Sequence, residues 1–193
     1  NPKIIIVAKT FSLSKIKPLL DFGHIHFGEN KIQEALEKWS DIKHNNNQIK
    51  LHMIGKLQTN KVKLAVKLFD YIHSVDNIKL ATKISDEQKK LNKNIKIFIQ
   101  INIGNEEQKS GINNNEVVEF YKSCNKLELD VVGTMCLPPD DDLSDNYFSK
   151  MQSINESLNL KEISMGMSND YLKAIKFKST FVRIGTKIFG QRF

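Results

Sequence analysis

The sequence predicts an α/β protein, a single parallel (β/α)8 barrel of the TIM type. Three observations indicate this: eight short apolar segments typical of strands, a helical or turn segment after each of them, and no Gly-x-Gly-x-x-Gly fingerprint after any strand. Strict alternation implies parallel strands joined by right-handed crossovers. Eight such units close into a barrel more naturally than they form an open doubly wound sheet, which the missing fingerprint also disfavours.

The first strand is predicted at residues 3–9, where four bulky aliphatics and an alanine leave no polar face. Such a segment is typical of a strand that is buried on both sides. Lys9 closes it, and an ammonium there is costly unless it is solvated, paired or chemically committed. On this strand alone, Lys9 would be a lysine that reaches along the apolar edge to water. A helix over residues 14–22 follows, with Gly23 as a stop signal.

The next three units repeat the pattern of a short apolar strand and an apolar stripe at helical spacing. Asp76 or Asn77 can cap the last of their helices. The units are strand 24–27 with stripe 32–39, strand 51–54 with stripe 62–69, and strand 71–74 with a helix that ends at residue 91.

The last four units complete the count. Strand 95–103 is the clearest after the first, and Pro138 and Pro139 forbid regular structure after the sixth strand. A turn is expected over residues 166–168. The units are 95–103 with helix 115–124, 129–135 with helix 143–158, 162–164 with helix 170–176, and 181–184 with a closing segment over 185–190.

Length and composition bound the rest. The 193 residues predict one domain over 1–193, a barrel trimmed against the roughly 250 residues that are typical. The net charge is +7, but Arg183 and Arg192 are the only arginines, so a solvated lysine surface is favoured over a nucleic-acid site. Cys124 and Cys136 have no paired-ligand spacing, which argues against a disulfide framework or metal site and favours a reducing, cytoplasmic compartment. No segment resembles a membrane span or a signal peptide, and a monomer is expected.

The loops after the seventh and eighth strands predict a phosphate site. In such barrels the working face is the carboxyl end of the strands, and phosphate groups commonly lie at these two loops. Small residues with hydroxyls occur in both, 164–169 and 183–186. Ser168 and Asn169 could instead be helix caps and Gly185 a plain turn, but two such loops at the two expected positions favour phosphate binding.

Lys9 is predicted to face the same pocket, because the first and eighth strands are neighbours once a barrel closes. A phosphorylated aldehyde held there could condense with its amine to a Schiff base, and pyridoxal phosphate (PLP) is the common cofactor that does so. Arg183, at the end of the eighth strand, is the candidate for facing the pyridine nitrogen. An arginine keeps its proton, so it would donate a hydrogen bond, leave that nitrogen unprotonated and make the ring a weak electron sink.

The sequence resembles the pyridoxal phosphate homeostasis proteins, which are similar to the N-terminal barrel domain of alanine racemase. The resemblance covers nearly the whole chain. It is carried by Val7-Ala8-Lys9-Thr10, Phe27-Gly28-Glu29-Asn30, His52-Met53-Ile54-Gly55, Leu57-Gln58-Thr59-Asn60-Lys61, His73-Ser74-Val75-Asp76, Lys109-Ser110-Gly111, Ser164-Met165-Gly166-Met167-Ser168, and Val182-Arg183-Ile184-Gly185-Thr186 before Ile188-Phe189-Gly190.

The resemblance implies a lone barrel that holds PLP as a Schiff base on Lys9 and serves intracellular PLP homeostasis by buffering or delivery, without substrate turnover. Apo PLP-dependent enzymes are the implied recipients. Asn30 is implied as a pocket residue or a helix cap, His52 as a hydrogen-bonded residue near the pocket wall, and residues 109–110 as a loop over the rim. The residues implied to bind the cofactor are Lys9, Asn30, Ser164, Gly166, Ser168, Arg183, Gly185 and Thr186.

Two alternatives stay open. One is a PLP-dependent racemase or decarboxylase of the same barrel type, which needs a second acid or base opposite Lys9; none of Tyr71, Tyr121, Tyr147 and Tyr171 has the position of that group. The other is nucleic-acid binding through the lysine coat, which should be steeply salt-dependent. Members of the family usually carry a helix before the first strand, and this sequence starts two residues from it, so either the floor of the barrel is less covered or residues before Asn1 are absent from this sequence.

Overall fold

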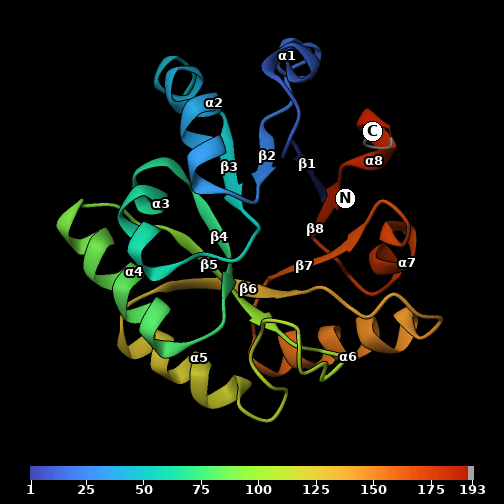
Figure 1. Cartoon of the computed structure of the whole chain (residues 1–193). Helices are drawn as coiled ribbons and strands as arrows, with labels where there is room; N and C mark the ends of the chain where they lie inside the picture. The colour runs from blue at the N-terminus through green and yellow to red at the C-terminus, as the bar shows by residue number, and fades with distance from the viewer. Residues whose placement is uncertain (191–193) are drawn as a thin grey trace.

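The computed structural model describes residues 1–190, and within them eight parallel strands close into a barrel in the order β1 to β8. The predicted TIM-type fold is confirmed. Figure 1 looks along the barrel, with the strands as an inner ring and the helices outside it. Arg192 lies outside the described residues. The strands are β1 Lys3–Val7, β2 His26–Glu29, β3 Lys50–Met53, β4 Tyr71–Val75, β5 Lys96–Ile101, β6 Asp130–Cys136, β7 Glu162–Met167 and β8 Phe181–Ile184.

The helices follow the strands as the sequence predicts. Asn77 caps its helix, because its side chain accepts a hydrogen bond from the backbone N–H of Leu80 at 2.9 Å. No helix among residues 1–190 is long and apolar enough to cross a bilayer. The helices are α1 Leu13–Asp21, α2 Ile32–Asn45, α3 Val62–Leu68 after the 3-10 turn Thr59–Lys61, α4 Ile78–Lys90, α5 Val117–Lys126, α6 Ser144–Ser157, α7 Tyr171–Lys176 and α8 Thr186–Phe189.

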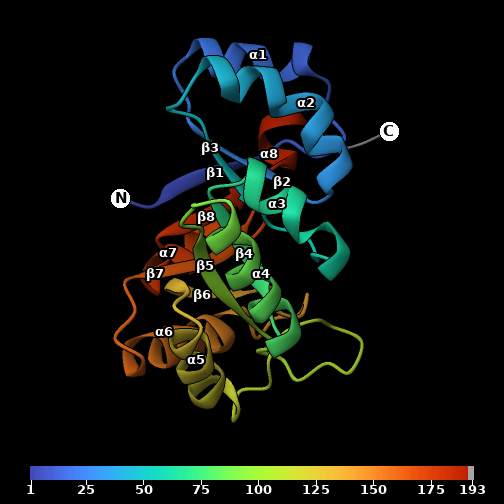
Figure 2. The same cartoon turned by 90° about the vertical axis from the view of Figure 1, so that its left-hand side faces the viewer.

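Closure of the barrel brings β1 beside β8, as expected. The two strands pair in parallel, with Lys3 opposite Phe181 and Ile5 opposite Arg183. In the side view of Figure 2 the chain starts at one end of the barrel, and the long loop after β5 lies at the other. Residues that follow β1 and residues that end β8 therefore meet at the carboxyl end of the strands.

Most element boundaries differ from the prediction by one or two residues, and two of the differences have identifiable reasons. β2 begins at His26 and not at residue 24, because His24 still belongs to the end of α1: its N–H bonds to the carbonyl of Leu19 and that of Gly23 to Leu20, the Schellman pattern. β7 runs on to Met167 through the expected turn. There Gly166 has φ +91°, and the pairing with β8 shifts register between Ser164 and Met167, so this glycine makes a bulge inside a strand.

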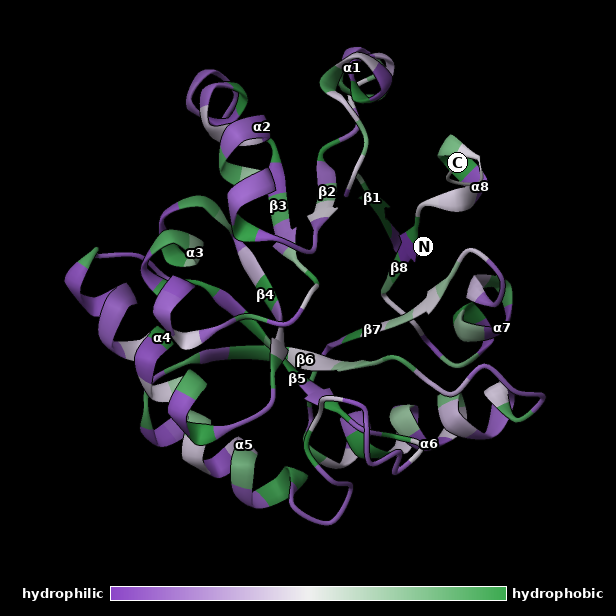
Figure 3. Ribbon diagram, viewed as in Figure 1, coloured by the Kyte–Doolittle hydropathy of each residue, from purple (hydrophilic) through white to green (hydrophobic). Residues whose placement is uncertain are grey.

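The hydrophobic core has two parts. The larger lies between the strands and the helices, while the smaller gathers Ile5, Tyr71, Phe98, Met135 and Phe181. The ring of Phe181 on β8 lies 5.7 Å from that of Phe98 on β5, so the smaller cluster fills the barrel interior. Figure 3 shows hydrophobic residues on the strands and hydrophilic residues mainly on the loops and on the helices.

Candidate functional site

The carboxyl ends of the strands surround a cavity of about 530 Å³. Its wall is formed by the segments that follow β1, β2, β3, β6, β7 and β8 and by the loop after β5. Much of this wall was predicted from the sequence. Six of the eight predicted site residues line the cavity: Lys9, Asn30, Ser168, Arg183, Gly185 and Thr186.

Lys9 lies in the turn directly after β1 and is half-buried. The next residue, Thr10, has φ +66°, a conformation that is rare for a β-branched residue. Side chains of α2 hold the backbone on both sides of the lysine. The ammonium of Lys38 donates to the carbonyl of Ala8 at 2.8 Å, and the N–H of Thr10 donates to the carboxylate of Glu34. The backbone of Lys9 is therefore fixed by its neighbours.

Lys38 and Glu34, which make these two contacts, belong to a buried ionic cluster with Glu29. The ammonium of Lys38 also lies 2.8 Å from Oε1 of Glu29 and 3.0 Å from Oε1 of Glu34. The carboxylate of Glu29 is fully buried, and its Oε1 accepts a further bond of 2.9 Å from the indole N–H of Trp39. Burial raises the pKa of Glu29, while the bonds from Lys38 and Trp39 oppose that rise. Sequence reasoning missed this cluster, although Glu34 and Lys38 have the i,i+4 spacing of a helical ion pair.

Arg183 is buried on β8, and two carbonyls and one hydroxyl hold it. Its Nη1 donates to the carbonyl of Ser164 at 2.8 Å and to the hydroxyl of Ser164 at 2.7 Å, and its Nη2 donates to the carbonyl of Cys136 at 2.7 Å. A guanidinium has five N–H donors. Among residues 1–190 these bonds use three of them, so two donors remain for a ligand in the cavity that Arg183 lines.

Ser168 joins the two loops that were predicted to bind phosphate. Its buried hydroxyl accepts from the backbone N–H of Gly185 at 3.3 Å and from that of Lys187 at 3.4 Å. The loop after β7 thereby contacts the start of α8, where backbone N–H groups lack partners within their own helix. As expected, residues of both loops line the cavity together with Lys9.

Asn30 lines the cavity and does not cap a helix. The residue at the start of α2 is Lys31, and no side chain caps that end. The side-chain oxygen of Asn30 is buried and has no hydrogen-bond partner among the described residues. Such an atom is costly unless a ligand or water satisfies it. The helix-cap interpretation is therefore wrong, and the pocket interpretation has support from this orphaned oxygen.

Three other predicted residues have clear positions. Lys109 lines the rim, as expected, and bonds to the carbonyl of Pro138 at 3.2 Å. Ser164 is fully buried beneath the cavity and does not line it; its hydroxyl bonds to Arg183 and to His73. His52 is hydrogen-bonded, as expected, but it lies inside the barrel and not on the pocket wall, because its side chain points inward from the middle of β3.

Gly166 does not line the cavity but shapes the chain that leads to Ser168. Its φ is +91°, and a Cβ there would lie 2.6 Å from the Cβ of Ala174 on α7. We expect Gly166→Ala to lower the free energy of unfolding by about 2 to 4 kcal/mol, from strain and overpacking together. Gly23→Ala is the matched control, because Gly23 has φ +89° with nothing within 4 Å and so tests the conformational cost alone. Equal losses of stability in urea denaturation would contradict the packing argument.

Comparisons with known proteins agree with this fold. The family model described as alanine racemase, N-terminal domain, matches residues 1–192, so the chain is a barrel of the alanine racemase N-terminal domain class. The chain is 37% identical over 201 residues to a pyridoxal phosphate homeostasis protein of Pasteurella multocida and 35% identical over 202 residues to that of Escherichia coli, covering 98% of this chain and 86% and 85% of those proteins. The chain belongs to the pyridoxal phosphate homeostasis protein family.

Solved structures of two kinds of protein have the same fold as this chain. The PLP-bound structure of PipY from Synechococcus elongatus matches with a TM-score of 0.90 at 28% identity, over 98% of this chain and 92% of that one. An alanine racemase of Clostridium difficile matches with a TM-score of 0.76 at 19% identity, over 99% of this chain and 53% of that one. The second likeness concerns the fold alone.

Proposed function

We propose that this protein binds pyridoxal 5'-phosphate in the cavity at the carboxyl end of the barrel and serves PLP homeostasis, with Lys9 as the point of covalent attachment. The observation that carries the proposal is the placement of Lys9, Arg183 and the Ser168–Gly185 contact around one cavity. The names of the relatives and the PLP bound to PipY support the same cofactor. When bound, PLP supplies an aldehyde that condenses with an amine and a ring that withdraws electrons.

The residues present fit this group. PLP has an anionic phosphate, polar ring substituents and a pyridine nitrogen. The wall offers the hydroxyl hydrogen of Ser168, whose oxygen accepts from Gly185 and Lys187, the two unused donors of Arg183 and the orphaned oxygen of Asn30. We assign Ser168, Gly185 and Thr186 to the phosphate, Arg183 to the nitrogen and Asn30 to a polar substituent. Ser164 and Gly166 do not line the cavity. Ser164 supports the site by holding Arg183, and Gly166 supports it by bending β7.

The ionic cluster and Arg183 each have a definite role in this proposal. The ionic cluster on α2 fixes the backbone that flanks Lys9, so the amine starts from a fixed position. Arg183 stays protonated and donates to the pyridine nitrogen, which keeps that nitrogen without a proton. An unprotonated ring withdraws electrons weakly, which suits a carrier that holds PLP more than an enzyme that activates substrates. We propose that the protein buffers PLP and passes it to apo enzymes.

The covalent step has a direct test. Incubation with PLP, reduction with borohydride and mass spectrometry of peptides should give one modified residue, Lys9, with a matching visible absorbance band before reduction. Lys9→Ala should abolish the trapped adduct, because the other lysine that lines this cavity in the described residues, Lys109, is paired with Glu106 and bonded to the carbonyl of Pro138. Lys31→Ala, at an exposed neighbouring lysine, is the control and should leave the adduct unchanged. A single-site adduct that persists in Lys9→Ala would refute the assignment.

Catalysis by the same barrel is the second candidate, and Lys109 is the observation that favours it. None of the four tyrosines lines the cavity, but Lys109 does, and its ammonium pairs with Glu106 at 2.5 Å. Holoprotein incubated with L-alanine in deuterated buffer should show no sustained exchange of the α-proton beyond that of PLP alone. Exchange with turnover that Lys109→Met removes would show an acid–base function for Lys109 and overturn the carrier proposal.

A further inference from the structure

A continuous chain of hydrogen bonds runs through the barrel interior to Arg183. Nδ1 of His26 lies 2.9 Å from Nε2 of His52, and Nδ1 of His52 lies 2.9 Å from Nε2 of His73. Nδ1 of His73 then lies 3.0 Å from the hydroxyl of Ser164, which accepts from Arg183 at 2.7 Å. The chain crosses β2, β3, β4, β7 and β8, so it links the floor of the barrel with the cavity.

Aromatic rings enclose the middle of this chain. His52 stacks on Tyr71 with ring centroids 4.3 Å apart, and His73 stacks on Phe98 at 4.1 Å. Both histidines are fully buried. Barrel interiors of this class are usually filled by branched aliphatic residues. Among residues 1–190 no group of three or more His, Cys, Asp or Glu side chains could hold a metal ion, so metal binding does not explain these histidines.

The chemistry of the donors gives the chain one direction. An arginine donates and never accepts, so Arg183 makes the hydroxyl oxygen of Ser164 an acceptor. The hydrogen of that hydroxyl needs another acceptor, and within the described residues the remaining partner of the hydroxyl is Nδ1 of His73. A neutral imidazole that accepts at Nδ1 carries its proton on Nε2. His73 therefore donates to His52, and His52 donates to His26.

All three rings are neutral at physiological pH. Burial lowers the pKa of His73 and His52 well below its usual value, with Arg183 adding to the effect at His73 and the other two histidines adding to it at His52, together with Lys43 and Lys3.

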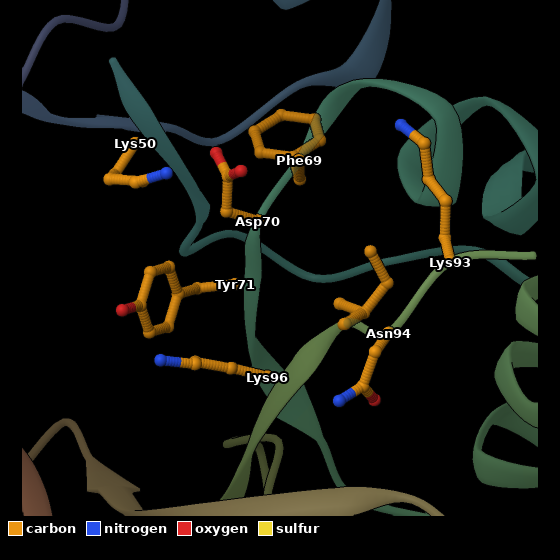
Figure 4. Close-up of a pocket in the computed structure, with 8 residues that line it drawn as sticks. Lys50, Phe69, Asp70, Tyr71, Lys93, Asn94 and Lys96 are labelled. Carbon is orange, nitrogen blue, oxygen red and sulfur yellow. The ribbon is translucent and has the colours of Figure 1, made fainter. Parts of the chain in front are cut away.

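The lower end of the chain meets the floor of the barrel. His26 is half-buried there, and burial, followed by the charges of His24, Lys3 and Lys50, lowers its pKa to about 4, against an opposing effect of Asp70. His26 pairs with Lys50 across β2 and β3. Figure 4 shows the floor pocket that Lys50 lines, with Lys50, Tyr71 and Lys96 extending to the same side from β3, β4 and β5. Within the described residues, His26 is the only member of the hydrogen-bonded chain that is not fully or nearly fully buried. The positive charges around the floor of the barrel disfavour an extra proton on its ring.

We propose that His26, His52, His73 and Ser164 are positioning residues for Arg183: they form a chain with a single proton order that keeps Arg183 directed at the cofactor. The proposal rests on the proposed function, because Arg183 is the group assigned to the pyridine nitrogen. While His73 takes its hydrogen, the hydroxyl of Ser164 keeps its oxygen turned toward Arg183 as an acceptor. A break at His73 would free the hydroxyl to rotate and would loosen the guanidinium.

The proton order is measurable without the cofactor. In apoprotein labelled with 15N-histidine, Nε2 of His73, His52 and His26 should resonate as a protonated ring nitrogen and Nδ1 as an unprotonated one, at neutral pH. His24→Gln and His44→Gln assign the two histidines outside the chain. A protonated Nδ1 or a mixture of tautomers at His52 or His73 in the wild type would overturn the proposal, whether or not the protein binds PLP.

Two variants test the link to the cofactor. His73→Phe keeps a ring to stack on Phe98 but removes the donor to His52, so His52 and His26 should lose their single tautomer, and PLP should bind about tenfold more weakly. Ser164→Ala should have the same effect on PLP, while exposed His44→Gln should have none. Unchanged PLP affinity in both variants would refute the positioning role. Failure of the wild-type protein to bind PLP would instead refute the proposed function. The histidine tautomers would then still test the hydrogen-bonded chain.

Discussion

Acidification from pH 6.5 to about pH 5 is expected to lower the free energy of unfolding by about 3 kcal/mol. The cause is the pair of fully buried histidines, His52 and His73, whose pKa values in the folded protein lie well below 6.5. In the unfolded chain both titrate near pH 6.5. Below that pH the unfolded state takes up two protons that the folded state refuses, so stability falls by about 1.4 kcal/mol per pH unit for each histidine.

The sign follows from which state binds more protons. Above pH 6.5 both histidines are neutral in both states and contribute no pH dependence. Below it the loss continues until the depressed pKa of each folded histidine is reached. Half-buried His26, whose pKa is lowered to about 4, adds to the loss. Glu29 acts in the opposite direction, because its raised pKa lets the folded state gain a proton earlier, so the two fully buried histidines set the net value. The window stops near pH 5 so that ordinary carboxylates do not yet contribute.

Urea denaturation at several pH values measures this slope. His73→Phe should reduce it by the share of one histidine, about 1.4 kcal/mol per pH unit, whereas His44→Gln, at an exposed position, should leave it unchanged. A free energy of unfolding that stays constant between pH 6.5 and pH 5 would show that the buried histidines take up protons in the folded state.

Lys38→Met is expected to cost about 3 to 5 kcal/mol of stability at pH 7. The substitution keeps much of the side-chain volume but leaves the carboxylate of Glu29 buried without its cation. The indole of Trp39 still donates to Glu29, which does not replace the lost charge. The loss should shrink toward pH 5.5, because the pKa of Glu29 is already raised by burial and rises further without Lys38. Denaturation at the two pH values measures both effects.

Two companion variants isolate the buried charge. Adding Glu29→Gln to Lys38→Met should recover part of the stability at pH 7, because a neutral amide replaces the unpaired carboxylate. Lys17→Met removes an exposed i,i+4 partner of Asp21 and should change stability by less than about 0.5 kcal/mol. PLP attachment should also slow in Lys38→Met, because Lys38 holds the carbonyl of Ala8 next to Lys9. Equal losses in Lys38→Met and Lys17→Met would contradict the argument.

The fold could be predicted because the signal for each unit is local. Apolar runs, helical stripes and stop residues lie within one segment, and closure of eight units then follows from parallel alternation. The pocket was predicted for the same reason, since Lys9, Ser168, Arg183 and Gly185 all follow or end strands whose carboxyl ends meet. The prediction failed at the end of β7, where a turn was expected at Gly166. A glycine is typical of turns, but it is also the residue that a strand needs for a bulge.

The contacts behind the pocket could not be predicted because they join segments far apart in sequence. Nothing within β2, β3 or β4 indicates that the rings of His26, His52 and His73 bond to one another, since the register that aligns them is set by the whole barrel. Ser164 was expected at the phosphate for a related reason. Its place in the loop motif was visible, but the inward direction of its side chain depends on where the bulge falls.

The pairing of β1 with β8 also decides when the site comes into existence during synthesis. Lys9 leaves the ribosome long before its barrel neighbour Arg183 and the loop at Gly185. Contacts of such large sequence separation form late, because the entropy of closing the intervening chain opposes them. A nascent chain therefore carries Lys9 before the other proposed cofactor-binding residues are in place. Under the proposed function PLP binds to the completed barrel, so a bound cofactor would report that folding has finished.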